Sequence, residues 1–421
     1  MSTPALTAPA PVPLPRIRAF ERRGFGLFLH WGLYSQLGQG EWAWTYHPHL
    51  RQDYARLADT FTAADFDADR LVRTAKAGGV RYLCLTTRHH EGFSLYDTRG
   101  LNTYDAPHSA AKRDLVQEFS TACERHGVGK FFYHTTLDWW HPDFDAPDRW
   151  DAYLAYLNAS VEVLCTQYGR VDGLWFDGNW AHKDRDWKES ALYSLIRRHQ
   201  PETIIVNNSS TGALGAEGHP EVDVRTFEQG RPTRPNRAGK PKWLAAEMCD
   251  TINSHWGIGA RDLSHKSPAE VIDRICACRR FGANYLMNIG PTAQGGLPGY
   301  EAELLALVGR WAALSPEAIY DAEPTDLECR NGDFVLRHGA TFYYFCRNLP
   351  IQGNMHLHQG ESGAGLRTVA GALSAVQRIA WTDASGDLAF QQDLPRGWLS
   401  FDATPFPYGT QLVWRIARIE T

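Results

Sequence analysis

The chain has 421 residues, which is enough for one large domain and one smaller domain. Its formal net charge of −5 leaves no excess of basic residues for binding nucleic acid or an anionic membrane, so we expect neither partner. A run of about 18 apolar residues, which is the length that spans a bilayer, is absent from the sequence.

The N-terminal residues 1–20 are rich in Pro and Ala and predict a flexible lead-in. They lack the basic start and the continuous apolar stretch of a signal peptide, so we expect a cytoplasmic protein, with a trimmed secretory signal as the alternative. The eight cysteines form no CxxC pair, and most of them lie in apolar segments. This pattern indicates reduced core thiols and fits a reducing compartment.

Short apolar runs alternate with amphipathic segments between residues 25 and 314. The apolar runs predict strands at 25–30, 81–87, 130–135, 171–177, 203–207, 222–227, 242–248 and 283–288. Helical spacing predicts helices at 66–77, 111–126, 150–168, 189–199, 267–281 and 300–314. Because strands that alternate with helices form parallel sheets, we expect an α/β fold built on a (β/α)₈ (TIM) barrel. The barrel is expected to be irregular, since no helix is predicted between the fifth and sixth strands.

The sequence changes character after about residue 315. Short β-rich runs at 333–337, 341–347, 354–357, 374–381 and 412–417 are separated by Gly, Pro and Asp. They predict an antiparallel β-sandwich of roughly 100 residues. The expected domains are a lead-in at 1–20, a catalytic barrel at 21–315 and a sandwich at 316–421, which is expected to support the barrel rather than to bind carbohydrate.

The run from Val171 to Gly178 predicts a buried strand that ends on a carboxylate. Side chains alternate along a strand, so Trp175 and Asp177 are expected to point to the same side. In a parallel barrel, reactive groups gather at the C-terminal ends of the strands. Those ends carry His, Trp and acidic residues, namely His30, Glu41, His89, His90, His134, Trp175, Asp177 and Glu228.

Several chemistries use such groups. A metal site needs three or more ligands in a fixed geometry, but His89 and His90 are adjacent and are expected to face opposite sides of a strand. A serine nucleophile would need a GxSxG elbow, which is absent. Two carboxyl groups suit glycoside hydrolysis, in which one carboxylate attacks the anomeric carbon and one protonated acid feeds the leaving oxygen. We therefore expect no metal and no cofactor.

Further motifs lie in order between residues 20 and 310. They are Phe25–Gly32, Gly40–Trp42, Leu85–Phe93, Asp172–Gly178, Glu247–Cys249, Thr251–Asn253, Trp256–Gly257 and Asn288–Pro291. Together they resemble the motifs of the retaining α-L-fucosidases of glycoside hydrolase family 29. The resemblance implies an irregular barrel followed by a β-sandwich. It also implies an enzyme that removes terminal α-L-fucose from a fucosylated oligosaccharide or glycoconjugate.

The resemblance implies roles for individual residues. Asp177 matches the nucleophile, which would form a glycosyl-enzyme and then release fucose with retained configuration. Trp256 matches an aromatic residue near the methyl group of the sugar. The positions that match contacts to the fucose hydroxyls, or the lining of the pocket, are His30, Glu41, His89, His90 and Trp175.

The acid/base is not fixed by the resemblance, because its position varies within the family. Glu228 follows one candidate strand, and Glu247 lies on the next. We favour Glu228 and expect Glu247 to orient its neighbours in the site. A retaining mechanism needs the two carboxyl groups about 5–5.5 Å apart.

Two positions depart from the family pattern. Many relatives have a Tyr that contacts the sugar where this chain has His134, and an Arg where it has Ser209, for which Arg225 is a candidate substitute. These departures leave two alternatives open. One is a non-catalytic fucose-binding or carbohydrate-binding protein with a degenerate site, and the other is the same chemistry on a galactose-type glycoside.

Other aromatic residues near the strand ends receive structural interpretations. Trp139, Trp140 and His141 are expected to anchor a packed loop rather than to touch the leaving group. Trp180 and Trp187 are also expected to be structural.

Overall fold

The computed structural model describes residues 9–208, 212–352 and 365–421. The chain divides into two compact units, one of residues 1–266 with 284–306 and one of residues 267–283 with 307–421. Within the described ranges, none of the helices is long and apolar enough to cross a bilayer.

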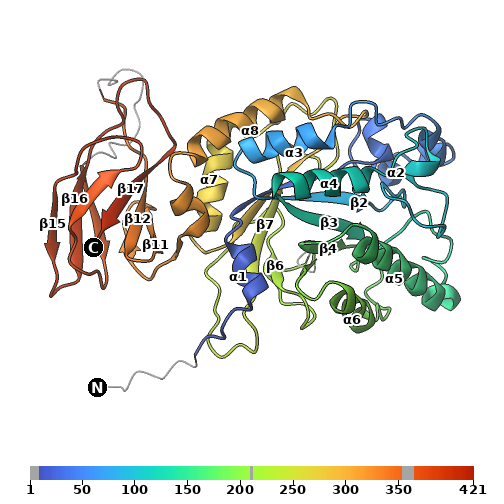
Figure 1. Ribbon diagram of the computed structural model, residues 1–421, viewed down its shortest axis with the longest axis horizontal. Helices are drawn as coiled ribbons and strands as arrows, with labels where there is room; N and C mark the ends of the chain where they lie inside the picture. The colour runs from blue at the N-terminus through green and yellow to red at the C-terminus, as the bar shows by residue number, and fades with distance from the viewer. Residues whose placement is uncertain (1–8, 209–211, 353–364) are drawn as a thin grey trace. The chain divides into compact units, whose positions relative to one another are not determined.

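The first unit is built around a closed barrel of eight parallel strands (Figure 1). In pairing order the strands are β1 (Phe25–Leu29), β2 (Tyr82–Arg88), β3 (Gly129–Thr135), β4 (Gly173–Asp177), β5 (Ile204–Asn207), β6 (Val224–Thr226), β7 (Ala245–Thr251) and β8 (Asn284–Ile289). The barrel closes where β8 pairs with β1, with Leu27 opposite Met287. Every strand overlaps its predicted range, and the predicted barrel is confirmed.

Helices connect most of the barrel strands. They are α3 (Ala68–Ala77), α4 (Leu115–His126), α5 (Trp150–Gln167), α6 (Glu189–His199), α7 (Pro268–Arg279) and α8 (Gly299–Ala312). Among the described residues, no helix connects β5 to β6, as expected, and none connects β6 to β7. Local sequence sets the helix ends. Asp114 caps α4 by accepting the N–H of Gln117, and Gly127 ends that helix with a φ of +63°.

The lumen of the barrel is filled by side chains from alternate strand positions. Two glycines make room for rings of the neighbouring strand. A Cβ on Gly26 would lie 2.3 Å from the Tyr82 ring, and one on Gly173 would lie 2.0 Å from the Phe131 ring. The buried cluster in the lumen includes Phe28, Tyr82, Cys84, Phe131, Tyr133, Trp175, Ile204, Val206, Val224, Ala245, Cys249 and Leu286. The lumen is therefore a packed core, which leaves the strand ends for a site.

The N-terminal lead-in contains a helix, α1 (Pro15–Glu21), so the predicted flexible segment is wrong for residues 15–20. The helix begins with Pro at a first-turn position, where a missing N–H costs no hydrogen bond. Its buried residues Ile17 and Phe20 join the lumen cluster. The Phe20 ring lies 5.6 Å from the Tyr82 ring, so α1 closes one end of the lumen.

A buried ion-pair network also holds α1. Arg16 donates two hydrogen bonds of 3.2 and 3.1 Å to the carboxylate of Asp223, which directly precedes β6. Arg197 on α6 donates to the same carboxylate at 2.8 Å, and Lys242 Nζ lies 2.9 Å from it. Burial alone would raise the pKa of Asp223, but Arg16, Lys242 and Arg197 hold it below its ordinary value. One carboxylate thus ties α1 and α6 to the barrel.

The second unit contains two antiparallel sheets, which confirms the predicted sandwich. One sheet has the order β10-β13-β16-β15, and the other has the order β14-β17-β12-β11-β9. The strands are β9 (Glu323–Pro324), β10 (Glu328–Cys329), β11 (Phe334–His338), β12 (Thr341–Arg347), β13 (Gly365–Ala370), β14 (Arg378–Trp381), β15 (Phe390–Asp393), β16 (Trp398–Ala403) and β17 (Trp414–Glu420). The run predicted at 354–357 lies outside the described residues.

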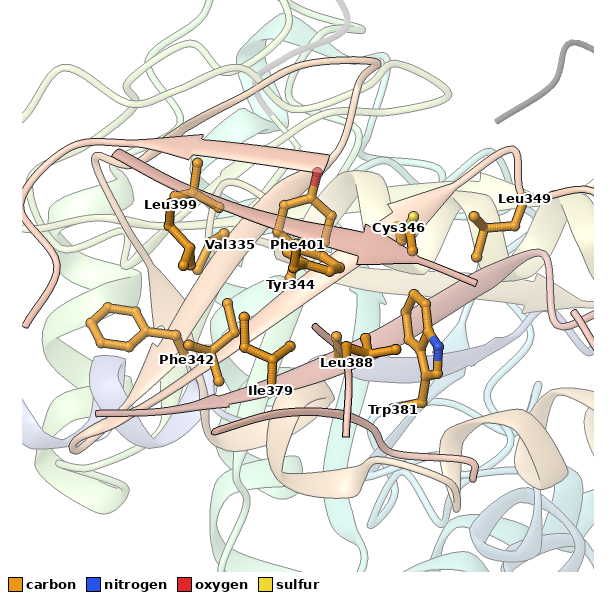
Figure 2. Packing of buried hydrophobic residues seen from close by; sticks show 14 of the residues in the cluster. Val335, Phe342, Tyr344, Cys346, Leu349, Ile379, Trp381, Leu388, Leu399 and Phe401 are labelled. Carbon is orange, nitrogen blue, oxygen red and sulfur yellow. The ribbon is translucent and has the colours of Figure 1, made fainter. Parts of the chain in front are cut away.

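Buried side chains from both sheets form the core of the sandwich (Figure 2). Tyr344 on β12 meets Phe401 on β16 edge to face, with ring centroids 4.9 Å apart. Ile379 and Leu399 are fully buried in the same cluster. Because inward and outward positions alternate along each strand, the sheets bury one face each.

The second unit also takes in α7 and the end of α8. Asp273 on α7 accepts a 3.1 Å hydrogen bond from Trp414 Nε1 and lies 2.9 Å from Arg347 Nη2. Trp311 on α8 donates to the carbonyl oxygen of Trp414 at 3.2 Å. The compact units therefore divide the chain differently from the boundary predicted at residue 315.

We expect Asp223→Asn to lower the free energy of unfolding by about 3 kcal/mol at pH 7, because it leaves Arg16, Arg197 and Lys242 without their shared anion. The pKa of Asp223 is lowered in the folded protein, so its stabilisation is present above the unfolded pKa and is lost as pH falls through the folded pKa. Urea unfolding from pH 7 down to pH 3 should therefore show the two proteins converging below about pH 4.

Asp53→Asn is the matched control, since Asp53 pairs with Arg56 on the exposed surface at 3.5 Å. Its effect should be close to zero. A stability difference for Asp223→Asn that did not change with pH would show that packing, not charge, is responsible.

Candidate functional site

A cavity of about 110 Å³ lies at the C-terminal ends of the barrel strands. It is lined by Phe28, His30, Trp42, His89, His90, Tyr133, Trp175, Asp177, Trp180, Asn208, Glu228, Cys249 and Trp256. The half-buried members of this set are Trp42, Asp177, Trp180, Glu228 and Trp256, and they form its rim. The predicted site residues that line it are His30, His89, His90, Trp175, Asp177, Glu228 and Trp256. Glu41, His134 and Glu247 were predicted for the site but lie outside this lining.

Asp177 ends β4 with its carboxylate in the cavity. Trp175, two residues earlier, faces the same cavity, as strand alternation predicts. Both carboxylate oxygens have donors. Trp180 Nε1 donates to Oδ1 at 3.0 Å, Tyr133 donates to Oδ2 at 3.3 Å, and His90 Nε2 lies 3.5 Å from Oδ2.

These neighbours keep Asp177 ionised. Burial alone would raise the pKa of Asp177, but the hydrogen bond and electrostatic interaction with His90, with the hydrogen bonds of Trp180 and Tyr133, lower it below its ordinary value. A carboxylate in this state can act as a nucleophile.

Glu228 follows β6 and has the opposite electrostatic environment. Burial raises its pKa, and the negative charges of Asp177 and Glu41 raise it further. Asn208, which follows β5, donates to Glu228 Oε2 at 2.8 Å and partly opposes that shift. The cavity therefore holds one carboxyl group that favours the ionised form and one that favours the protonated form.

Glu247, on β7, is buried beneath the cavity and does not line it. It accepts one hydrogen bond from the Tyr82 hydroxyl and one of 2.9 Å from Trp175 Nε1. Burial raises the pKa of Glu247 to about 7, although both hydrogen bonds oppose the shift. With both oxygens engaged, Glu247 fixes the Trp175 indole, which agrees with the expected orienting role.

His30 follows β1, and its hydrogen bonds determine which ring nitrogen carries the proton. Asn288 on β8 donates through Nδ2 to the carbonyl oxygen of Trp256 at 2.6 Å, so its Oδ1 faces His30 Nδ1, also at 2.6 Å. That oxygen only accepts, which places the proton of His30 on Nδ1. Burial lowers the pKa of His30 to about 3, so the ring is neutral and Nε2 is an acceptor.

His89 and His90 both line the cavity, with ring centroids 4.2 Å apart, so the expectation that they face opposite sides is wrong. β2 ends at Arg88, and its pairing with β3 shifts register between Thr86 and Arg88. Strand alternation therefore no longer governs the two residues that follow.

The second nitrogen of His90 is held by Thr135. His90 Nδ1 lies 2.7 Å from Thr135 Oγ1, and Thr135 gives its own hydrogen to the carbonyl oxygen of Leu137. Thr135 therefore accepts from His90, and Nδ1 carries a proton. His90 Nε2 is the ring nitrogen that faces Asp177 Oδ2.

His134 does not reach the cavity, although it was predicted among the reactive groups gathered at the strand ends. Its ring is buried outside the lumen, where Nε2 lies 3.2 Å from the Tyr96 hydroxyl and Nδ1 lies 2.7 Å from the carbonyl oxygen of Thr135. Tyr133, one residue earlier, points inward instead. Counting alternate positions back from Asp177 through the pairing of Tyr133 with Trp175 selects the Tyr.

Glu41 holds a loop rather than lining the cavity. Its Oε2 accepts the backbone N–H groups of Trp256 at 3.1 Å and of Gly257 at 2.8 Å. Burial raises the pKa of Glu41, and the hydrogen bond from Gly257 opposes this. Glu41 thus positions Trp256, which lines the cavity.

Trp180 has a larger part in the site than the structural role predicted for it. It follows Asp177 by one short turn and donates to that carboxylate, as described above. Its ring stacks on Trp42 with centroids 5.7 Å apart and planes 21° apart. Trp42 in turn meets Trp139 edge to face. Trp140 stacks on Tyr104 and is absent from the cavity lining, as a loop anchor would be.

The predicted substitute cation is not found in the cavity. Ser209 lies outside the described residues, and no Lys or Arg occurs among the described residues that line the cavity. Arg225 has its Nη1 3.9 Å from Glu217 Oε1 instead. Asn208 is the polar group that this part of the barrel contributes.

Comparisons with known proteins converge on one family. A family model described as Alpha-L-fucosidase matches residues 12–317. Tissue alpha-L-fucosidase of Homo sapiens is 26% identical over 408 residues, covering 90% of this chain and 83% of that protein. Plasma alpha-L-fucosidase of Rattus norvegicus is 28% identical over 427 residues, covering 93% and 90%. Among solved structures, alpha-L-fucosidase isoenzyme 1 from Paenibacillus thiaminolyticus superposes with a TM-score of 0.82 at 27% identity, covering 96% and 98%.

We expect Trp180→Phe to raise the pKa of Asp177 by about one pH unit, because phenylalanine keeps a ring against Trp42 but removes the N–H donor. Titration of the Asp carboxyl ¹³C resonances would measure this. Trp187→Phe is the control on the same loop, since Trp187 Nε1 donates to the carbonyl oxygen of His182. Equal Asp177 titration curves in all three proteins would contradict the hydrogen bond.

Proposed function

This chain belongs to the α-L-fucosidase family of retaining, exo-acting glycosidases, and we propose that Asp177 is its nucleophile and Glu228 its acid/base. The observation that carries this assignment is the contrast between the two carboxyl groups of the cavity. Donors lower the pKa of Asp177, whereas burial and two negative charges raise that of Glu228. A retaining glycosidase needs one ionised and one protonated carboxyl group at the start of its cycle.

In the first step, a carboxylate oxygen of Asp177 attacks the anomeric carbon of the fucose. The bond from that carbon to the leaving oxygen breaks, and Glu228 gives its proton to the leaving oxygen. The product is a fucosyl ester of Asp177 and a Glu228 carboxylate. Esterification neutralises Asp177 and so removes one of the negative charges that raise the pKa of Glu228, which lowers that pKa and suits Glu228 to act next as a base.

In the second step, Glu228 takes a proton from water while the water oxygen attacks the anomeric carbon. The ester bond to Asp177 breaks, which restores the Asp177 carboxylate and releases fucose with retained configuration. A Bacteroides thetaiotaomicron family 29 fucosidase has been captured as a covalent intermediate with 2-fluoro-fucosyl fluoride. That species corresponds to the ester in this scheme.

The sugar is held by neutral and aromatic groups. His30 is suited to accept a hydrogen bond from a fucose hydroxyl through Nε2, because its other nitrogen is committed to Asn288. The rings of Phe28 and Trp256, with centroids 6.0 Å apart, offer an apolar surface beside His30 for the methyl group of fucose. This combination fits a 6-deoxy sugar better than a galactose-type sugar, whose 6-hydroxyl would meet that apolar surface.

A non-catalytic fucose-binding protein is the weaker alternative. Binding alone does not require a carboxylate with three donors beside a second carboxyl group of raised pKa. Such groups are costly to bury, and they are expected where chemistry occurs.

We expect Asp177→Asn to lower kcat on an aryl α-L-fucoside by on the order of 10⁴-fold, because the amide cannot form the ester. Release of the aryl alcohol measures turnover, and circular dichroism checks that the fold persists. Near-normal turnover by this variant would remove Asp177 from the mechanism, and fucose binding without hydrolysis by the unaltered protein would favour the binding protein.

We expect Glu228→Ala to slow hydrolysis of a fucosylated oligosaccharide by about 10²- to 10⁴-fold, because its leaving oxygen needs a proton. Hydrolysis of an aryl fucoside with an acidic leaving group should slow much less, because that leaving group departs without protonation. Azide should restore part of the activity and yield a fucosyl azide of retained configuration. In the unaltered protein, kcat/KM should fall at high pH as Glu228 loses its proton, and the raised pKa of Glu228 moves that fall to higher pH. Glu228→Gln should remove this high-pH limb, because the amide does not titrate.

Glu247→Gln is the comparison variant. Because Glu247 orients Trp175 from outside the cavity, this change should affect both substrates alike. Azide rescue by the Glu247 variant instead of the Glu228 variant would exchange the two assignments.

A further inference from the structure

Glu91 is a buried acid that the proposed mechanism does not use. It lies in the segment after β2, two residues beyond His89, and only 1% of its surface is exposed. Neither of its side-chain oxygens accepts a hydrogen bond of normal geometry from the residues that the structure describes. A carboxyl group in such surroundings is costly to ionise, because water is excluded and nothing replaces its hydrogen bonds.

The fold makes room for the Glu91 carboxyl group behind the wall of the catalytic pocket. Gly32, which follows β1, lies against it, and a Cβ on Gly32 would come within 2.6 Å of Glu91 Oε1. Glu91 Oε2 lies 3.7 Å from His89 Nδ1, a buried nitrogen that also lacks a hydrogen-bond partner among the described residues. A side-chain movement of about 0.8 Å brings the two atoms to hydrogen-bond distance. Two polar groups without other partners therefore face each other.

The surroundings of Glu91 favour its protonated form. Burial raises the pKa of Glu91 to about 8, and the negative charges of Asp138 and Glu41 act in the same direction, whereas the backbone N–H groups of Glu91 and Leu33 oppose the rise. Its other titratable neighbours are tyrosines that stay uncharged because burial raises the pKa of each, namely Tyr34, Tyr54, Tyr104 and Tyr133. At neutral pH, Glu91 is therefore mostly an uncharged acid with an O–H to donate.

His89 is uncharged as well. Burial lowers the pKa of His89 well below its ordinary value, and His90 and His30 lower it further. The His89 ring stacks on Tyr133, with centroids 5.6 Å apart and planes 14° apart, which fixes the plane of the imidazole. Because Nδ1 is enclosed beside Glu91, Nε2 is the nitrogen that remains for the cavity.

A neutral imidazole carries one proton, and the partner of one nitrogen decides where that proton lies. An O–H of Glu91 donates to an unprotonated Nδ1, which leaves the proton of His89 on Nε2. His30, whose ring centroid lies 5.5 Å from that of His89, has the opposite arrangement, with its proton on Nδ1. The two neighbouring histidines differ because His30 donates to an amide oxygen and His89 accepts from a carboxylic acid.

We propose that Glu91 is a positioning residue that holds His89 in the Nε2–H tautomer, so that His89 donates a hydrogen bond to the sugar while His30 accepts one. The inference rests on the proposed fucosidase site and adds the group that sets the polarity of one of its walls. A hydroxyl between the two rings can donate to His30 and accept from His89 at once, whereas a hydrogen atom at the same carbon does neither.

The tautomer is measured by long-range ¹H–¹⁵N correlation spectra of histidine-labelled protein, with the His89 signals assigned from their loss in His89→Gln. At about pH 6, below the pKa of Glu91, we expect the Nε2–H form in the unaltered protein. Glu91→Gln should keep this form, because the amide N–H still donates to Nδ1, and Glu91→Leu should lose it. An Nδ1–H form in the unaltered protein, or an unchanged tautomer in the leucine variant, would overturn the proposal.

Inhibition by L-fucose measures the consequence for sugar binding. Glu91→Leu should raise the inhibition constant by roughly fivefold to tenfold, as expected for one lost hydrogen bond, and Glu91→Gln should stay within about twofold. In the unaltered protein the constant should rise between about pH 7 and about pH 9, because ionised Glu91 draws the proton of His89 to Nδ1. Glu91→Gln should lose this rise and Glu228→Gln should keep it, which separates it from the high-pH limb assigned to Glu228.

Glu118→Gln is the matched control, because Glu118 pairs with Arg113 at the surface. It should change neither the tautomer nor the inhibition constant. If Glu91→Leu does not fold, Glu91→Gln still decides the matter, since a retained tautomer without the pH dependence is expected only if the Glu91 proton is responsible. Equal loss of fucose binding in both Glu91 variants would show a packing role and overturn the proposal. Failure of the unaltered protein to cleave any fucoside would instead overturn the proposed function, whereas the spectra need no turnover.

Discussion

The alternation of side chains along the strands of a closed barrel is the constraint on which the site depends. Positions that point into the lumen fill it with rings at one level and place reactive groups at the next level up. Trp175 stacks on Tyr133 with centroids 5.7 Å apart, and Asp177 stands two residues beyond Trp175 on the same side. The site is therefore a continuation of the lumen core, and the packing of the core fixes the position of the Asp177 carboxylate.

The two carboxyl groups of the cavity, Asp177 and Glu228, differ because their surroundings differ, not because one is Asp and the other Glu. Asp177 meets three donors, one from within β3, one from the segment after β2 and one from its own loop. Glu228 meets a single amide and faces other acids. Glu247 shows the third outcome, in which both oxygens are committed to an indole and a phenol and no atom remains for a substrate. The hydrogen-bond partners and charges supplied by different strands thus give the three acids three different states.

Much of the barrel could be predicted from sequence, because an apolar run with polar breaks is a local pattern. The helix α1 could not, because its stability comes from Phe20 in the lumen and Arg16 on Asp223, contacts between residues far apart in the chain. The inward orientation of Tyr133 could have been predicted, since alternation counted from Asp177 selects Tyr133 in place of His134. The shared orientation of His89 and His90 was not, because a register shift leaves no local signature.

The Asn288 amide gives the pocket a direction of hydrogen bonding. The Asn288 N–H donates to the backbone of Trp256, and its oxygen accepts from His30 Nδ1. The other ring nitrogen of His30, Nε2, can therefore only accept a hydrogen bond. A substrate hydroxyl can donate a hydrogen bond to this nitrogen. A fluorine at the same carbon is no larger than a hydroxyl but cannot donate a hydrogen bond, so it would bring one lone pair against another. This wall of the pocket therefore selects a substituent by its ability to donate a hydrogen bond and not by its size.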